Sequence, residues 1–286
     1  MKPPSVLRPA EWSHPVPPVR REVTSARPSD QDDDYAYGSS RADASSAGEA
    51  KRPPVLFVPG LGHGAWAYEE HWLEHTAARG FPAHAMSLRG HGGSGTAPGT
   101  SLRAYVHDVV QVASGLPRQA VLVGHGAGAL VVAHALSRYP ARAAVLLAPV
   151  FGGWGTLGNA LLRNPTSTAL GAFGRPIRLR RGQLFSPNLH GSAARAYGDR
   201  IGGTTARVQW QLLRARGPER PVGDPPVLVV GSPDDRIVSQ KALREVATRY
   251  GGAPLLFPGM GHDMMLDAGW AEPIDAIIDW LGKAER

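Results

Sequence analysis

Short, uninterrupted apolar runs recur along most of the chain, separated by longer segments in which apolar residues return every three or four positions. The runs predict six strands, near residues 54–59, 82–87, 119–124, 143–148, 226–231 and 253–257. Because polar residues do not alternate within these runs, both faces of the strands are expected to be buried. The longer segments predict five helices, near residues 66–79, 101–116, 127–139, 239–250 and 270–283. Strands and helices that alternate at this spacing are typical of an α/β fold with a mostly parallel sheet flanked by helices.

Two long segments interrupt this alternation. Residues 1–52 hold seven prolines, many serines and a short acidic run. Such a composition buries too little apolar surface to offset the entropy of ordering, so we expect a disordered leader. The stretch between the strands near 143–148 and 226–231 is far longer than a crossover between parallel strands needs. We therefore predict an insertion over residues 150–225, with residues 53–149 and 226–286 forming the core domain.

Composition narrows the possible classes. The chain has 286 residues, 42% of them apolar, which is enough for a full core, and it has no cysteine. Disulfides, thiol catalysis and zinc–thiolate sites are therefore excluded. No apolar run reaches the roughly 18 residues that a membrane-spanning helix needs, so no integral membrane segment is expected. The N-terminus lacks the apolar stretch of a secretory signal, which favours the cytoplasm.

The formal net charge of +7 raises the question of a nucleic-acid partner. The densest basic run, from Arg175 to Arg181, lies in the predicted insertion and has no aromatic residue within it. Because no nucleic-acid-binding motif accompanies this run, we expect no nucleic-acid partner. A solvated face, or a weak preference for anionic substrates near the insertion, accounts better for the charge.

The most informative motif joins a predicted strand to a predicted helix within residues 121–136. Its turn reads G-H-G-A-G over residues 124–128. A strand–G-x-S-x-G–helix unit presents a serine nucleophile on a strained turn, and here Gly126 occupies the serine position. The turn also matches the G-x-G-x-x-A pattern of dinucleotide-binding folds. That alternative needs an acidic residue at the end of the next strand, where Ala148 and Pro149 stand instead.

Four further motifs accompany this turn along the chain. They are the glycine-rich stretch 59–64, the stretch 88–94, the acidic stretch 231–238 and the stretch 258–262, which ends in a histidine. Together with the turn at residues 124–128, they make the chain resemble the α/β-hydrolase superfamily, specifically its lipase- and esterase-like members. The resemblance covers roughly residues 53–283 and implies an α/β-hydrolase fold, in which residues 150–225 would be the cap.

The resemblance also implies the roles of individual residues. His262 would be the catalytic base and Asp235 the acid that orients it, with Asp234 as a competitor more suited to the turn. Backbone N–H groups of Leu61 and Ala127 would form the oxyanion hole.

Gly126 departs from the family pattern, which has serine at this position. Glycine relieves the strain of the turn, of order 1–3 kcal/mol, and supplies no nucleophile. Ser94 and Ser232 offer no obvious replacement, since each belongs to a turn of its own.

Several histidines are ambiguous. The pattern H-x-x-E-H, which is typical of a metal site, is formed by His71, Glu74 and His75. Ordinary surface histidines are the better interpretation. We expect no metal and no cofactor. His63 and His125 flank the predicted oxyanion hole and either shape it or pack within their loops.

Three functions remain open at this point. The chain is either an ester hydrolase that carries a replaced serine, or a non-hydrolytic enzyme of the isomerase or lyase type that uses His262 as a base, or a ligand-binding protein without turnover. In each case the expected partner is a small apolar ester-like or acyl compound. The sequence leaves the oligomeric state undetermined.

Overall fold

A computed structural model describes residues 16–28, 52–97, 100–151, 179–203, 206–214 and 217–284. Its centre is a seven-stranded sheet in the order β1-β3-β2-β4-β5-β6-β7, in which only β1 runs antiparallel to its neighbour. The strands are β1 (Val23–Ala26), β2 (Val55–Val58), β3 (Ala83–Met86), β4 (Val121–His125), β5 (Ala143–Leu147), β6 (Val227–Gly231) and β7 (Leu255–Leu256). The predicted mostly parallel sheet is thereby confirmed, and all six predicted strands are present.

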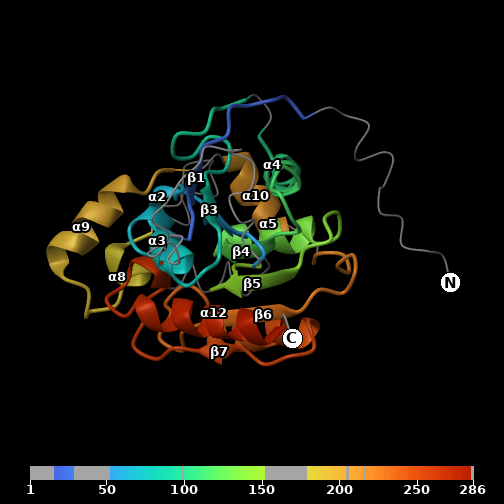
Figure 1. The fold of residues 1–286 in the computed structure, drawn as a ribbon. Helices are drawn as coiled ribbons and strands as arrows, with labels where there is room; N and C mark the ends of the chain where they lie inside the picture. Colours follow the sequence, from blue (N-terminus) through green and yellow to red (C-terminus); the bar gives the residue numbers. More distant parts are fainter. Residues whose placement is uncertain are drawn as a thin grey trace, which may run out of the picture.

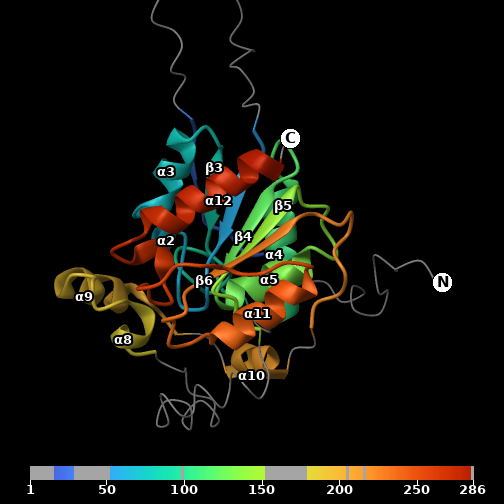
Figure 2. The same ribbon diagram turned by 90° about the horizontal axis from the view of Figure 1, so that it is seen from below.

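Helices cover both faces of the sheet (Figures 1 and 2). One face carries α4 (Leu102–Ser114), α5 (Ala127–Ala135) and α11 (Gln240–Arg249), and the other carries α2 (Trp66–Glu69), α3 (Trp72–Ala78) and α12 (Ala271–Ala284). The central strands alternate between the two resulting cores: Leu56 packs on the first side and Phe57 on the second, and neither is exposed to solvent. The absence of polar alternation in the sequence therefore has the physical meaning expected for a sheet buried on both faces.

Helix boundaries follow local capping. Ser101 and Ser239 accept hydrogen bonds from the backbone N–H groups of Ala104 and Ala242, which sets the starts of α4 and α11. The single helix predicted near residues 66–79 is instead split into α2 and α3. The split comes at His71, whose backbone leaves the helical region at φ −145° while its ring stacks on that of Trp270 at 4.6 Å. None of the described helices is long and apolar enough to cross a membrane.

The prediction of a disordered leader over residues 1–52 is wrong for residues 16–28, which we call the N-terminal arm. Within the arm, β1 pairs antiparallel with β3 at the edge of the sheet, from Val23 opposite Met86 to Ala26 opposite Ala83. The rest of the predicted leader, residues 1–15 and 29–51, lies outside the described residues.

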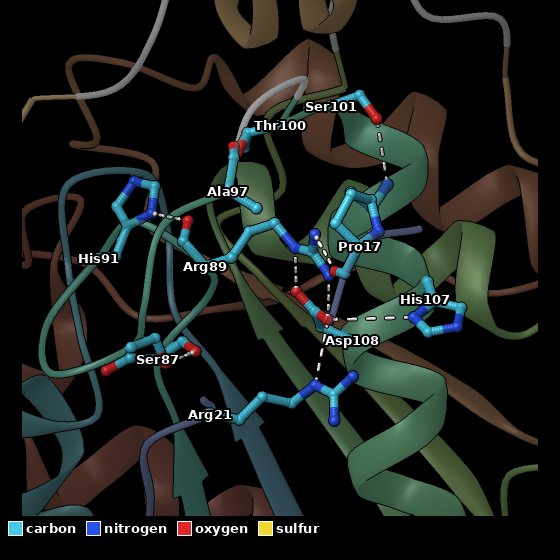
Figure 3. A network of polar contacts seen from close by, with 12 residues as sticks. Pro17, Arg21, Ser87, Arg89, His91, Ala97, Thr100, Ser101, His107 and Asp108 are labelled. Carbon is cyan, nitrogen blue, oxygen red and sulfur yellow. Dashed lines mark hydrogen bonds and ion pairs between the residues drawn. The ribbon is translucent and has the colours of Figure 1, made fainter. Parts of the chain in front are cut away.

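Buried charges anchor the arm (Figure 3). Arg89 is 1% exposed and forms a two-pronged ion pair with Asp108 of α4, with N–O distances of 2.6 Å for both bonds. Arg21 adds a third donor to the same carboxylate at 3.1 Å, and the Arg89 guanidinium also donates to the backbone carbonyl of Pro17. The side chain of Glu22 accepts hydrogen bonds from Ser87 and from the Gly93 N–H. Contacts with side chains far away in the sequence hold the N-terminal arm in place, so the composition of the predicted leader did not reveal that the arm is ordered.

The insertion between β5 and β6 contains α8 (Arg181–Leu184), α9 (Gly191–Arg200) and α10 (Ala206–Arg214) among its described residues. Its described residues contact the core at three places. Val208 of α10 is fully buried in the core on the α4 and α5 side. Leu184 accepts a hydrogen bond from the Asp263 N–H at 2.9 Å, and Gly202 donates one to the Gly62 carbonyl at 2.8 Å. Residues 152–178, 204–205 and 215–216 of the insertion lie outside the described residues.

Candidate active site

The turn between β4 and α5 keeps the conformation of a nucleophile-bearing turn although it has no nucleophile. Gly126 has φ 55° and ψ −120°, a backbone geometry that a side chain adopts only under strain. Its N–H donates to the Leu147 carbonyl at 2.9 Å, and its own carbonyl accepts from the Val150 N–H at 2.9 Å. Backbone bonds to both sides of the end of β5 therefore hold the turn in place without any contribution from a serine side chain.

The flanking glycines let the strand and the helix pass closely, as the motif predicts. A Cβ at Gly124 would lie 2.7 Å from the Ala129 Cα, and a Cβ at Gly128 would lie 2.7 Å from the Val58 carbonyl oxygen. Distances below 3.0 Å are not tolerated between such atoms, so both positions require glycine for packing. Gly126 differs, because a Cβ there would meet first a side-chain atom, Nε2 of His262, at 3.2 Å.

The structure brings His262 and Asp235 together. His262 follows β7 and is 4% exposed, and its Nδ1–H donates to Asp235 Oδ2 at 2.8 Å. The other carboxylate oxygen of Asp235 accepts from the N–H groups of Ile237 at 2.7 Å and Val238 at 3.1 Å. Both oxygens of Asp235 are thereby held, and Nε2 of His262 is left pointing at Gly126.

Asp234, the competing acid, lies elsewhere. Its carboxylate accepts from the Gly259 N–H at 2.7 Å, and its own N–H donates to Ser232 Oγ at 3.1 Å. These bonds brace the two loops that carry Asp235 and His262, which agrees with the expectation of a turn residue. Ser232 is fully buried within the same turn.

The loop after β2 lies against the turn at Gly126. A Cβ at Gly126 would be 3.9 Å from the Gly60 Cα, so Leu61, the next residue, stands beside the first turn of α5, where Ala127 is the first residue. The structure therefore brings together the segments of Leu61, Ala127 and His262. The roles of the Leu61 and Ala127 N–H groups as oxyanion donors stay a prediction.

Electrostatics around His262 favour its charged form. Burial lowers the pKa of His262, but the charge and hydrogen bond of Asp235, with a further contribution from the charge of Asp263, outweigh burial and raise it above the usual value. A histidine whose pKa is raised in this way is a better base toward a weakly acidic proton.

A second buried polar cluster lies beside this pair and consists of His63, His125 and Asp263. Nε2 of His63 donates to Asp263 Oδ2 at 3.0 Å, and Nε2 of His125 lies 3.2 Å from the His262 carbonyl oxygen and 3.5 Å from Asp263 Oδ1. The sequence motifs indicate the two histidines but not Asp263. The available signal was its position directly after the predicted base.

The same cluster is where the described residues offer ligands to a metal ion, because one ligand atom from each side chain lies within 4.8 Å of the others. However, Nε2 of His125 faces a backbone carbonyl, which can only accept a hydrogen bond. That nitrogen therefore carries the ring proton, so the lone pair of the His125 ring lies on Nδ1, which is buried with no hydrogen-bond partner among the described residues. The expected absence of metal and cofactor stays a prediction.

The other candidates from the sequence have structural partners. Ser94 Oγ donates to the Ser87 carbonyl at 2.7 Å and accepts from the Glu22 N–H at 2.9 Å, so it belongs to the anchorage of the N-terminal arm. His75 Nε2 bonds to Asp275 at 2.8 Å, and His71 stacks on Trp270. The H-x-x-E-H pattern is thus occupied by contacts between α3 and the α12 region.

Comparisons with known proteins bear on the family and the fold. A family model described as the alpha/beta hydrolase family matches residues 55–280. No curated protein matches the chain in sequence.

Among solved structures, a monoacylglycerol lipase of Paleococcus ferrophilus is 20% identical, with 82% of this chain and 96% of that one covered and a TM-score of 0.64. A soluble variant of monoglyceride lipase from Saccharomyces cerevisiae is 14% identical, with coverages of 95% and 94% and a TM-score of 0.69. An esterase from a Rhodococcus species is 24% identical, with coverages of 82% and 92% and a TM-score of 0.61.

Proposed function

Because the chain belongs to the alpha/beta hydrolase family, we propose that it is a relative of carboxylic-ester hydrolases in which His262 acts as a general base without a serine nucleophile. One observation carries the proposal: Nε2 of His262 lies 3.2 Å from where a Cβ of residue 126 would be, and Asp235 holds the ring from the other side. The base is therefore aimed at the place where the family's nucleophile would stand. In this chain it would take a proton from a water molecule or from the substrate itself.

The reaction balances without a covalent enzyme intermediate. In hydrolysis, His262 removes a proton from water as the water oxygen bonds to the acyl carbon, and the protonated histidine then returns the proton to the departing alkoxide or thiolate. The N–H groups of Leu61 and Ala127 would stabilise the negative oxygen of the tetrahedral intermediate. Asp235 would stabilise the imidazolium that forms in between.

The rate enhancement that a general base can provide indicates the substrate class. General-base catalysis contributes typically about 10²–10⁴-fold, which is modest for an ordinary ester. We therefore propose a small apolar acyl compound with an activated bond, such as a thioester or a strained lactone, bound under a cap formed by residues 150–225. The neighbouring lipases and esterases support the acyl class, and no cofactor is part of the proposal. A cytoplasmic location stays a prediction from the sequence.

A panel of thioesters, lactones, p-nitrophenyl esters and epoxides, assayed with the unchanged protein and with His262→Ala, tests the proposal. We expect turnover of at least one activated substrate, reduced by about 10² or more in His262→Ala. Turnover that survives His262→Ala unchanged would overturn the role of His262 as a base.

The second candidate is a ligand-binding protein, and the absence of any hydroxyl or thiol on residue 126 favours it. Saturable binding of acyl compounds with no turnover across the panel would support that alternative. Proton exchange or rearrangement of a substrate without cleavage would instead support an isomerase or lyase that uses the same base.

A further inference from the structure

Three loops meet at the candidate site, and each carries one member of the buried cluster next to a site residue. His63 lies two residues after Leu61, His125 directly precedes Gly126, and Asp263 directly follows His262. We propose that His63, His125 and Asp263 are positioning residues that lock these three loops to one another and so fix His262 over residue 126. The catalytic part of this proposal rests on the proposed function, whereas the structural part stands without it.

The first lock joins the turn at Gly126 to the histidine loop. Nε2–H of His125 donates to the backbone carbonyl of His262 at 3.2 Å, and the two rings lie 4.8 Å apart between centroids. The side chain of the residue before Gly126 thus fixes the main chain of the base. Since this bond involves no atom of residue 126, the loss of a serine leaves it intact.

The second lock joins the histidine loop to the loop after β2. Asp263 Oδ2 accepts from His63 Nε2 at 3.0 Å, and His63 Nδ1 lies 3.3 Å from the Leu61 carbonyl oxygen. The carboxylate after the base therefore holds the loop whose Leu61 N–H is the predicted oxyanion donor. Nε2 of His125 lies 3.5 Å from the second carboxylate oxygen, which accepts no hydrogen bond among the described residues, so the two locks are adjacent but not directly hydrogen-bonded to each other.

Burial makes these bonds costly to replace. His63, His125 and Asp263 are 3%, 1% and 0% exposed, so none of the three is solvated by bulk water. Burying a carboxylate without partners is strongly unfavourable, whereas apolar residues of similar volume would fill the same space at no such cost. A polar cluster at this place is therefore explained by its directional bonds rather than by packing alone.

The protonation states fit the same arrangement. Burial, together with the neighbouring charge of His262, lowers the pKa of His125 to about 3, so this ring stays neutral as a fixed donor. Burial raises the pKa of Asp263, but the surrounding histidines outweigh burial and lower it, which keeps the carboxylate ionised. The charged and titratable groups around His262 are then Asp235, Asp263, His125 and His63. Among them Asp263 places a second negative charge near the base, beside that of Asp235.

The first experiment needs no turnover. The pKa of His262 is measured by NMR titration of its ring Cε1–H in the unchanged protein, in Asp263→Asn and in a matched control, Asp275→Asn, whose carboxylate is at the surface of α12. We expect Asp263→Asn to lower the pKa of His262 by on the order of one unit, because a nearby negative charge favours the imidazolium. Asp275→Asn should leave the pKa unchanged. A folded Asp263→Asn protein with an unchanged His262 pKa would overturn the proposal.

If Asp263→Asn does not fold, His63→Gln replaces it in the same titration, because glutamine keeps an N–H donor toward Asp263. A His262 pKa close to that of the unchanged protein is then expected. His63→Leu should change the pKa of His262, because the Asp263 carboxylate loses its hydrogen-bond donor. Identical titrations for His63→Gln and His63→Leu would overturn the second lock.

The second experiment measures positioning in a Gly126→Ser background, where turnover follows the position of the base. His125→Leu should lower kcat by about 10- to 100-fold with little change in KM, because a base displaced by a fraction of an ångström loses alignment. His125→Gln, which retains a donor at the place of Nε2, should recover most of the loss. Equal losses in both variants would contradict the first lock. If the Gly126→Ser protein has no activity, the oxyanion donors or the aim of His262 are inadequate, while the NMR titration still decides the fate of the cluster.

Discussion

Two regions of this protein bury charged groups, and they do so with opposite consequences. At the candidate site, His262, Asp235 and the adjacent cluster come from the carboxyl ends of four different strands, and Nε2 of His262 is left pointing at residue 126. At the N-terminal arm, two hydrogen bonds of 2.6 Å join Arg89 and Asp108, and neither side chain belongs to the candidate active site. The first region arranges polar groups for chemistry, whereas the second uses them to tether one segment to another.

The difference shows what a change in each region should alter. Gly126 can gain a side chain at the cost of local strain, because the turn is held by backbone bonds to Leu147 and Val150. Asp108 cannot lose its side chain without leaving a buried guanidinium unpaired. Changes at the site are therefore expected to alter activity more than stability, and changes at the arm are expected to do the reverse.

The largest expected effect is on activity. Gly126→Ser should raise hydrolysis of short p-nitrophenyl esters by about 10³-fold or more, because a triad serine accounts for about 10⁶ in turnover in a complete site. The ring of His262 must retreat slightly, since a Cβ at this residue would lie 3.2 Å from Nε2. Initial rates and a urea denaturation curve measure the two consequences.

Gly126→Ala is the matched control for that experiment. It carries the same strain of roughly 1–3 kcal/mol without a hydroxyl, so it should lose stability and gain no activity. A well-folded Gly126→Ser protein that is no faster than the starting protein would show that the oxyanion donors or the aim of His262 are inadequate.

The next effect concerns stability alone. Asp108→Ala should lower the free energy of unfolding by about 3–5 kcal/mol, because Arg89 would remain buried without its partner. Asp275→Ala, at a surface pair with Arg79, should cost less than about 1 kcal/mol. Urea denaturation measures both.

In a Gly126→Ser background, neither substitution should change the activity of each folded molecule. A selective loss of kcat in Asp108→Ala would remove the distinction between the two regions.

The smallest effect is a dependence of stability on pH that belongs to the site. His125 has a pKa of about 3 when folded and an ordinary value near 6.5 when unfolded, so the unfolded chain takes up more protons as the pH falls below 6.5. The free energy of unfolding should drop by about 1 kcal/mol between pH 6.5 and 5.5 from this group. His262 works in the opposite sense, because its raised pKa adds stability at low pH that is lost as the pH rises through the folded value.

His125→Gln separates the two histidines, since glutamine keeps the donor and removes the titration. Between pH 6.5 and 5.5 the variant should lose less stability than the unchanged protein, as followed by thermal unfolding in matched buffers. Parallel curves for the two proteins would mean that His125 does not stay neutral in the folded state.

The same two regions show what the sequence could and could not reveal. Apolar runs identified β2 to β6, because most residues of these strands are buried between the two layers of helices, and a further run identified β7 although Leu255 is exposed. The order of motifs identified Asp235 and His262, and the structure places them in contact. By contrast, β1 has only four residues, of which Ala26 alone is buried, so no apolar run marks it.

Long-range polar contacts escaped prediction for a related reason. Arg89 lies next to a glycine-rich turn and Asp108 in the middle of a helix, and nothing in either local pattern announces a shared buried ion pair. Asp263 was missed because its partner His63 is 200 residues away in the chain. Periodicity reports which side of an element is buried, whereas a pairing between two polar side chains depends on how the elements pack.

Strand β1 has one more consequence, which concerns how molecules of this protein meet each other. An uncovered β3 would present a row of free backbone donors and acceptors, which is a template for pairing with another chain. The antiparallel β1 covers that edge, and the opposite edge is β7, a strand of only two residues. A chain that lost its N-terminal arm would therefore gain a route to edge-to-edge aggregation, even if its site remained intact.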